Sequence, residues 1–162
     1  MEEYTEIARY ITDAKTDSKK VIFTHGVFDL LHAGHLATLQ ESKAMGDILI
    51  VGVDSDPLVK ALKSPKRPII TASERVELVK ALKVVDQAFV ITPSPEEIGD
   101  IANYFSHLYE FLKPDIVTAG LPSENGIHIM RICKQLKIDF QIAGAEVINT
   151  TTNIINKVRE SF

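Results

Sequence analysis

The sequence predicts an α/β fold, namely a Rossmann-like, doubly wound, five-stranded parallel sheet with helices on both faces. Short apolar runs alternate along the chain with segments whose apolar residues recur at helical spacing, the pattern of a parallel sheet covered on two sides. The run Ile48–Val53 is apolar throughout, as in a strand buried on both faces. The length of 162 residues suits one domain over 1–162, with an N-terminal helix and linker in 1–19 and the catalytic core in 20–162.

The elements of the first half follow from spacing and helix ends. Residues 2–15 carry apolar side chains at helical spacing, and the polar segment 16–20 separates them from a strand at 21–24. A helix over about 34–45 is expected to end at Gly46, because glycine suits the left-handed turn that follows a helix.

The second half continues the alternation, and Thr71 or Ser73 can cap the helix that follows the second strand. Because ligands of such sheets lie beyond the carboxyl ends of the strands, where the strand order changes, we expect the site at the turn 25–35. The remaining expected elements are a strand at 88–91, one long helix introduced by Pro93 and Pro95 and ending at Leu112, a strand at 116–118, a helix at 124–137, a strand at 140–143 and a helix from about Thr151.

Composition excludes several classes of protein. The formal net charge of −4 argues against a surface that coats nucleic acid, so we expect no nucleic-acid partner and only a local anion site. Cys133 is the only cysteine, which excludes an intrachain disulfide and a cysteine-based zinc site. The first residues lack the features of a signal peptide, and no apolar run approaches the roughly 20 residues of a membrane span. We therefore expect a cytoplasmic protein with no membrane partner.

The segment 24–35, THGVFDLLHAGH, is the most informative stretch of the chain. His32 and His35 stand three residues apart, with Gly34 between them where the helix is expected to begin. A helix N-terminus favours an anion, because its free N–H groups and the positive end of its dipole point outward. Neither histidine has an adjacent serine or cysteine to activate, so the pair indicates phosphate handling.

The same segment offers further candidates and one alternative. Gly26 allows the backbone to approach a ligand closely, Phe28 is expected to fill the core, and Asp29 could orient an imidazole or cap the loop. The histidines at 25, 32 and 35 could instead bind zinc, but no carboxylate or thiol ligand stands at a usual spacing. No dedicated metal site is expected.

A basic group follows the second strand and comprises Lys60, Lys63, Lys66 and Arg67, with Arg75 on the next helix. Lys60 and Lys63 would share one helical face, so both could reach a triphosphate. Cations on a mobile segment suit phosphoryl-type transfer, which depends on alignment and on charge placed where the leaving group becomes more negative. A solvated basic face is the alternative interpretation.

The polar segment 149–153, NTTTN, precedes the apolar pair Ile154-Ile155 near the C-terminus. Hydroxyl groups and free amides at the start of a helix can hold phosphate oxygens, which makes the threonines of this segment candidates for binding a nucleotide. A plain helix N-cap is an equally natural interpretation.

These three segments together resemble the cytidylyltransferase-like nucleotidyltransferases, whose signature is HxGH. The similarity runs from about Lys20 to Phe89 and returns at the C-terminal TTNII. The sequence is more similar to the adenylyltransferase domain of ADP-heptose synthase than to glycerol-3-phosphate cytidylyltransferase. The resemblance implies transfer of a nucleotide from an NTP to a phosphorylated small-molecule acceptor with release of pyrophosphate, Mg²⁺ bound with the NTP, and a homodimer.

The resemblance also implies roles for individual residues. His32, His35, Lys63 and Arg75 are expected to be catalytic, the histidines stabilising the oxyanion and the two cations holding the departing phosphates. Residues expected to contact the acceptor are Asp54 and Asp56. Those expected to bind the nucleotide are Thr24, His25, Gly26, Phe28, Asp29, Gly34, Lys60, Ala119, Gly120, Thr150, Thr151 and Thr152.

ATP with a sugar 1-phosphate, such as heptose 1-phosphate, is the preferred substrate pair, and CTP with a polyol or amino-alcohol phosphate is the alternative. Glycerol-3-phosphate cytidylyltransferase has an arginine shortly before the C-terminal motif, whereas this chain has Gly144-Ala145-Glu146, as expected for the heptose type. The loop 119–126 departs from the family pattern, which leaves the acceptor open and admits a nucleotide-sensing module without turnover. A flavin- or nucleotide-binding carrier is a further alternative, although it has no need for paired histidines.

Overall fold

The computed structural model, which describes residues 1–120, 124–144 and 149–161, contains one five-stranded sheet in the order β3-β2-β1-β4-β5. All four strand pairings are parallel. The predicted fold class is therefore confirmed. The strands are β1 (Val21–Gly26), β2 (Ile48–Asp54), β3 (Gln87–Ile91), β4 (Ile116–Ala119) and β5 (Asp139–Ile142).

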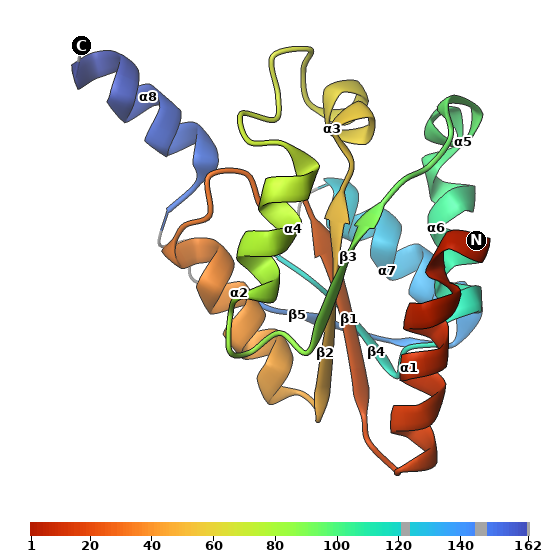
Figure 1. Ribbon diagram of the computed structural model, residues 1–162. Helices are drawn as coiled ribbons and strands as arrows, with labels where there is room; N and C mark the ends of the chain where they lie inside the picture. Colours follow the sequence, from red (N-terminus) through yellow and green to blue (C-terminus); the bar gives the residue numbers. More distant parts are fainter. Residues whose placement is uncertain (121–123, 145–148, 162) are drawn as a thin grey trace.

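Helices lie on both faces of the sheet (Figure 1). α2 and α4 cover one face, and α1, α6 and α7 cover the other, while α8 leads away from the body. The helical elements are the 3₁₀ turn η1 (Glu2–Tyr4), α1 (Thr5–Thr16), α2 (Ala33–Ala44), α3 (Asp56–Leu62), α4 (Ala72–Lys80), α5 (Pro95–Gly99), α6 (Ile101–Leu112), α7 (Glu124–Leu136) and α8 (Thr151–Ser161).

The alternation of side chains along β1 separates two hydrophobic cores. Val21 and Phe23 pack with the apolar residues of α1, α6 and α7, whereas Ile22 between them packs with those of α2 and α4. This is the two-residue period of a strand that is covered on both faces. The N-terminal segment belongs to the first core, because Tyr4 and Ile11 are almost fully buried there.

The structure corrects one predicted helix and shows which residue caps another. The single long helix expected between Pro93 and Leu112 is two helices, because the backbone leaves helical geometry at Asp100 (φ −130°, ψ 60°) and the Asp100 side chain caps α6. Ser94 caps α5 separately, in a capping box with Glu97. Of the two candidate caps of α4, the capping residue is Thr71.

The change of strand order falls at β1, which pairs with β2 on one side and with β4 on the other. The carboxyl ends of these three strands therefore meet at one edge of the sheet, beside the loop that leads to α2. Within the described residues, no helix is long and apolar enough to cross a membrane.

Candidate active site

The loop between β1 and α2 has an unusual backbone. Phe28 and Leu30 both lie in the left-handed region, with φ of 51° and 48°. A non-glycine residue in that conformation is unfavourable by about 1–3 kcal/mol and persists only where the surroundings hold it. Such strain is concentrated at functional sites, and here it shapes the turn that presents the paired histidines.

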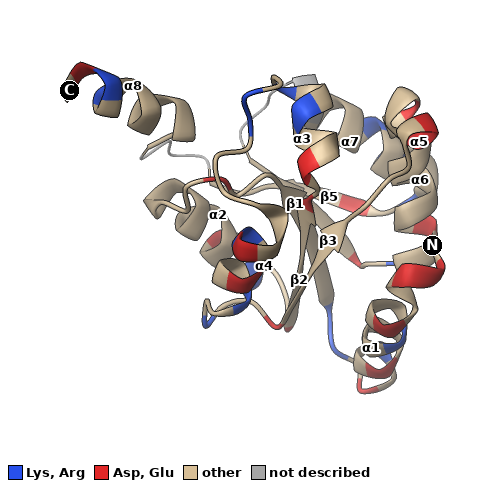
Figure 2. Cartoon of the chain, turned by 45° about the horizontal axis from the view of Figure 1, so that its top comes forward, with Lys and Arg blue, Asp and Glu red and all other residues tan. Residues whose placement is uncertain are grey.

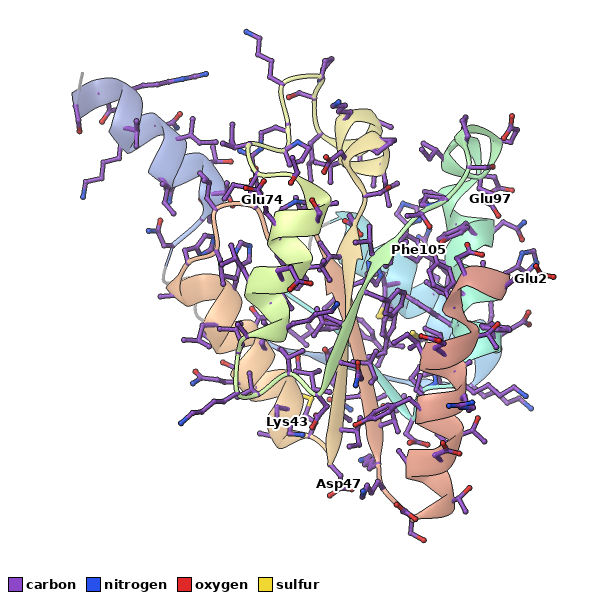
Figure 3. The ribbon with its side chains drawn as sticks, viewed as in Figure 1. Glu2, Lys43, Asp47, Glu74, Glu97 and Phe105 are labelled. Atoms are coloured by element: carbon purple, nitrogen blue, oxygen red, sulfur yellow. The ribbon has the colours of Figure 1, made fainter. Side chains whose placement is uncertain are left out.

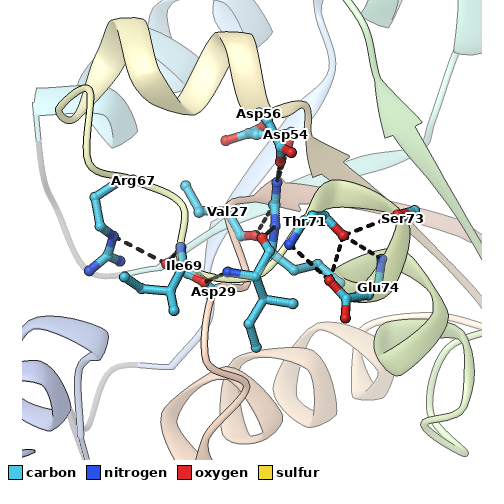
Figure 4. Close-up of polar contacts among 11 residues, drawn as sticks. Val27, Asp29, Asp54, Asp56, Arg67, Ile69, Thr71, Ser73 and Glu74 are labelled. Carbon is cyan, nitrogen blue, oxygen red and sulfur yellow. Dashed lines mark hydrogen bonds and ion pairs between the residues drawn. The ribbon is translucent and has the colours of Figure 1, made fainter.

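The buried carboxyl group of Asp29 holds this loop against a second segment (Figure 4). It accepts hydrogen bonds from the backbone N–H groups of Ile69 (2.9 Å) and Ile70 (3.0 Å), and its Oδ2 lies 3.1 Å from Arg67 Nε. Of the two roles expected of Asp29, these contacts support the capping of a loop, and its expected contact with the nucleotide stays a prediction. Its carboxyl is only 1% exposed and is fully engaged in joining two loops.

His32 and His35 form a stacked pair at the start of α2, with ring centroids 3.8 Å apart. His32 is the N-cap residue, and its Nδ1 accepts a hydrogen bond from Gly34 N at 3.1 Å. In a neutral ring, this bond leaves the proton on Nε2, which is then a donor for a ligand. Phe28 lies against His35 at 5.4 Å between ring centroids, so it supports the pair from the core, as predicted.

Both histidines are held in the neutral form at pH 7. Burial is the main cause that lowers the pKa of His35 to about 4; the neighbouring His32 lowers it further, and Asp29 acts in the opposite direction. Burial likewise lowers the pKa of His32. The pair therefore offers N–H donors without a positive charge.

A cavity of about 570 Å³ opens over this pair, and we call it the first cavity. It brings together the N-terminus of α2, the segment after α3 and the residues before α8. Its lining consists of Val27, His32, Gly34, His35, Thr38, Lys63, Ser64, Arg67, Gly120, Gly144 and residues 149–152.

The C-terminal threonines reach the first cavity, as the predicted nucleotide role requires. Thr151 Oγ1 donates a hydrogen bond to the carbonyl of Asp29 at 2.9 Å, and Thr150 Oγ1 accepts one from Asn153 N. The N-cap interpretation of this segment therefore also holds, because Thr150 caps the helix from a position on the cavity wall. Gly34 permits the approach of the two segments, since a Cβ there would lie 2.7 Å from the carbonyl oxygen of Asn149.

A second cavity, of about 370 Å³, adjoins the first and shares Val27, Lys63 and Gly120 with it. Three residues expected at the nucleotide, His25, Gly26 and Ala119, line this second cavity. The rest of its described lining consists of Asp54, Val59, Leu62, Ile101, Ala102, Phe105, Gly126, His128, Ile129 and Ile132. Two ligand-sized spaces thus meet at the carboxyl ends of β1 and β4.

Lysine and arginine positions lie along α3 and the segment that follows it (Figure 2). Lys63 borders both cavities. Lys60 is exposed and lines neither cavity, although Lys63 continues α3 as its C-cap residue. Arg67 lines the first cavity, although no role in the site was predicted for it. In the sequence it is recognisable only as a member of the basic group after the second strand, followed by Pro68.

Arg75 does not occupy the predicted position at the departing phosphates. Its side chain is completely buried and donates to the carbonyl oxygens of Ile70, Val27 and Asp54, and to the carboxylate of Asp56 at 2.7 Å (Figure 4). Asp56 is correspondingly engaged with Arg75 and is not on the lining of the second cavity. The expectation for Arg75 is corrected, because its buried side chain braces the loops, whereas the expected contact of Asp56 with the acceptor stays a prediction.

Two further predicted residues, Thr24 and Phe28, are buried below the site and line neither cavity. Thr24 Oγ1 donates to the carbonyl of Thr118 at 3.0 Å, which joins β1 to β4. Within the ranges that the structure describes, no group of three or more potential metal ligands is found.

The family model described as cytidylyltransferase-like matches residues 23–162. Bifunctional protein HldE of Helicobacter pylori (strain ATCC 700392 / 26695) is 47% identical over 104 residues, which are 64% of this chain and 21% of the relative. Bifunctional protein HldE of Sulfurimonas denitrificans is 38% identical over 157 residues, or 96% of this chain and 30% of the relative. The chain thus spans less than a third of the length of these curated relatives.

Solved structures agree with the architecture. The lipopolysaccharide core biosynthesis protein from Thermoplasma volcanium GSS1 superposes with a TM-score of 0.60 at 31% identity, covering 76% of this chain and 93% of that one. Pantoate-beta-alanine ligase from Francisella tularensis reaches a TM-score of 0.60 at 17% identity, covering 95% and 76% of the two chains, and shares the fold alone.

Arg75→Met is expected to destabilise the fold by about 3–5 kcal/mol, because it leaves the Asp56 carboxylate and three carbonyl groups without their partner. Urea unfolding measures the loss. Lys60→Met, at an exposed position outside both cavities, is the matched control and should stay within about 0.5 kcal/mol of the wild type. An Arg75→Met protein that keeps its stability and loses only nucleotide affinity would restore the predicted phosphate role.

The low pKa of His35 predicts a loss of stability in acid. The unfolded chain takes up a proton near pH 6.5, whereas the folded site resists it to about pH 4, so the free energy of unfolding should fall as the pH drops through this window. His35→Gln should make the decline shallower in urea titrations at successive pH values. Replacing the exposed His107 by Gln is the control, and equal slopes for all three proteins would contradict the assignment.

Proposed function

The chain belongs to the cytidylyltransferase-like family, and from this we propose that it is a nucleotidyltransferase that transfers NMP from an NTP to a phosphorylated small molecule, with release of pyrophosphate. The preferred substrates are ATP and a sugar 1-phosphate of the heptose 1-phosphate type. One observation carries the proposal: two neutral, stacked imidazoles at a helix N-terminus face a cavity that is also lined by Lys63, Arg67 and the hydroxyl-bearing segment 149–152.

In the proposed reaction, an oxygen of the acceptor phosphate attacks the α-phosphorus of the NTP. The bond from this phosphorus to the oxygen that bridges to the β-phosphate breaks, and its electron pair leaves with pyrophosphate. No covalent enzyme intermediate is needed, so the protein acts by alignment and by stabilising developing charge.

The roles of the side chains follow from their positions around the first cavity. His32 and His35 would donate N–H groups to the oxygens around the α-phosphorus, where negative charge increases in the transition state. Lys63 and Arg67 would hold the departing phosphates, with the start of α8 opposite them. The acceptor would approach from the second cavity, because the two spaces meet at Lys63.

We propose that Mg²⁺ enters as the counterion of the NTP. The described residues offer no cage for a resident ion, and Asp29 and Asp56 are engaged with Arg67 and Arg75. The ion would neutralise part of the triphosphate charge.

The choice of a heptose-type acceptor rests on resemblance. The motifs are more similar to the adenylyltransferase domain of ADP-heptose synthase than to glycerol-3-phosphate cytidylyltransferase, and a solved relative at 31% identity is named a lipopolysaccharide core biosynthesis protein. The same resemblance supports two further parts of the proposal, a homodimer and a cytoplasmic location.

The test is a screen of ATP, CTP, GTP and UTP against sugar, polyol and amino-alcohol phosphates, scored by release of pyrophosphate. The expected result is turnover with ATP and a sugar 1-phosphate. Turnover only with CTP and a polyol phosphate would favour the alternative substrates. NTP binding without pyrophosphate release in any combination would contradict the enzyme and favour a nucleotide-sensing module.

His35→Ala should lower kcat on the order of 10²–10³-fold, by analogy with the loss of one oxyanion donor. Circular dichroism and the unfolding midpoint show whether the variant is folded. Leu36→Ala, which changes a partly exposed neighbour on the same helix, should leave kcat unchanged. Near-full activity of a folded His35→Ala protein would remove the role assigned to this imidazole.

A further inference from the structure

We propose that Asp54 binds a hydroxyl group of the acceptor in the second cavity and thereby determines which phosphorylated compounds are used. The inference rests on the proposed function, and it assigns to one carboxyl group the recognition of the acceptor end that lies away from the reacting phosphate.

The first observation is an unsatisfied buried oxygen. Asp54 is the last residue of β2 and is only 7% exposed, yet its Oδ1 has no hydrogen-bond partner among the residues that the structure describes. A buried acceptor without a partner is unfavourable by about 1–3 kcal/mol and is rare in folded proteins. Because Asp54 lines the second cavity, a ligand there can supply the missing donor.

His25 does not supply the hydrogen-bond donor that Asp54 Oδ1 lacks. Its Nδ1 lies 3.7 Å from Asp54 Oδ1, which is too far for a hydrogen bond. The ring is fixed where it is, because Nε2 lies 2.8 Å from the hydroxyl oxygen of Tyr109 and the ring stacks on Phe105 at 4.2 Å. Phe105 belongs to α6, on the side that faces the sheet (Figure 3). The His25 ring is therefore held away from Asp54, and the Oδ1 atom of this buried carboxyl group is left for a ligand.

The remaining lining narrows the chemical class of that ligand. Asp54 is the one acidic residue on the described lining, and most of the other side chains are apolar. A carboxyl group among apolar walls accepts from a hydroxyl, whereas it repels a second phosphate or a carboxylate. With the acceptor phosphate beside Lys63 at the junction of the cavities, the expected acceptor is a singly phosphorylated, hydroxylated compound whose C–H faces pack on the apolar walls.

The decisive experiment combines variants of Asp54 with deoxy analogues of the acceptor. The substrates are ATP, or whichever NTP is most active in the screen, and the most active sugar phosphate with its set of monodeoxy analogues. The proteins are the wild type, Asp54→Leu, which removes both oxygens, and Asp54→Asn, which retains one accepting oxygen in a similar shape. Asp13→Asn, an exposed carboxyl on α1, is the control.

In the wild type, one monodeoxy analogue should lose on the order of 10–100-fold in kcat/KM, because its partner oxygen stays unpaired. Asp54→Leu should lose a similar factor with the parent acceptor and should no longer discriminate against that analogue. Asp54→Asn should fall between the two proteins. The KM for the NTP should not change in any variant.

A purely structural role of Asp54 would lower stability without abolishing the discrimination between parent and analogue. The inference is overturned if no monodeoxy analogue is impaired with the wild type, a result that needs no variant to fold. It is also overturned if Asp54→Leu raises the KM for the NTP in place of that for the acceptor. Both results are compatible with the proposed transferase activity. Absence of pyrophosphate release from the wild type would instead contradict the proposed function itself.

Discussion

The site depends on a buried polar network in which Asp29 and Arg75 tie together segments that are distant in sequence. The side-chain carboxyl group of Asp29 accepts hydrogen bonds from the backbone of residues 69–70, and the backbone carbonyl of Asp29 accepts one from the Thr151 hydroxyl. The loop after β1 is therefore bound both to the segment before α4 and to the start of α8. Arg75 joins the same loop, through Val27, to the end of β2. A charged group that is almost fully buried is tolerated only when it is paired and hydrogen-bonded, so removal of either member would leave several groups unsatisfied at once.

This network explains how a strained loop is held in one conformation. Left-handed geometry at Phe28 and Leu30 turns the chain so that His32 reaches the N-cap position of α2, and Asp29, between the two, fixes the turn from within. The imidazoles therefore do not rely on hydrogen bonds to one another for their orientation. His32 is set by its bond from Gly34 N, and His35 by burial against Phe28.

The sequence predicted the parts of this arrangement that have a local signal. Alternating apolar runs determine the sheet, and the spacing of His32 and His35 around Gly34 marks a helix start that needs no tertiary information. Arg75 was misassigned because its charge is visible in the sequence and its burial is not: an arginine on a helix after a basic run looks like a phosphate ligand until the carbonyl groups around it are known. Asp54 and Phe105 meet at the second cavity only because the first half of α6 lies near the carboxyl end of β2, a juxtaposition that no pattern of spacing encodes.

The neutral state of the histidines separates the groups that would bind the substrate from the groups that would lower the barrier. A pair with a pKa of about 4 at His35 contributes no net charge to binding, so the proposed function assigns the attraction of a triphosphate to Lys63, Arg67 and the N–H groups at the starts of α2 and α8. In the proposed reaction, the imidazoles act where charge changes and add little to binding of the ground state. A formal positive charge at this place would stabilise the substrate, the transition state and the product alike. A neutral N–H donor can lower the barrier without also strengthening the binding of pyrophosphate. Under the proposed function, burial of the pair therefore contributes to catalysis, and the apolar ring of Phe28 beneath it helps to keep the imidazoles neutral.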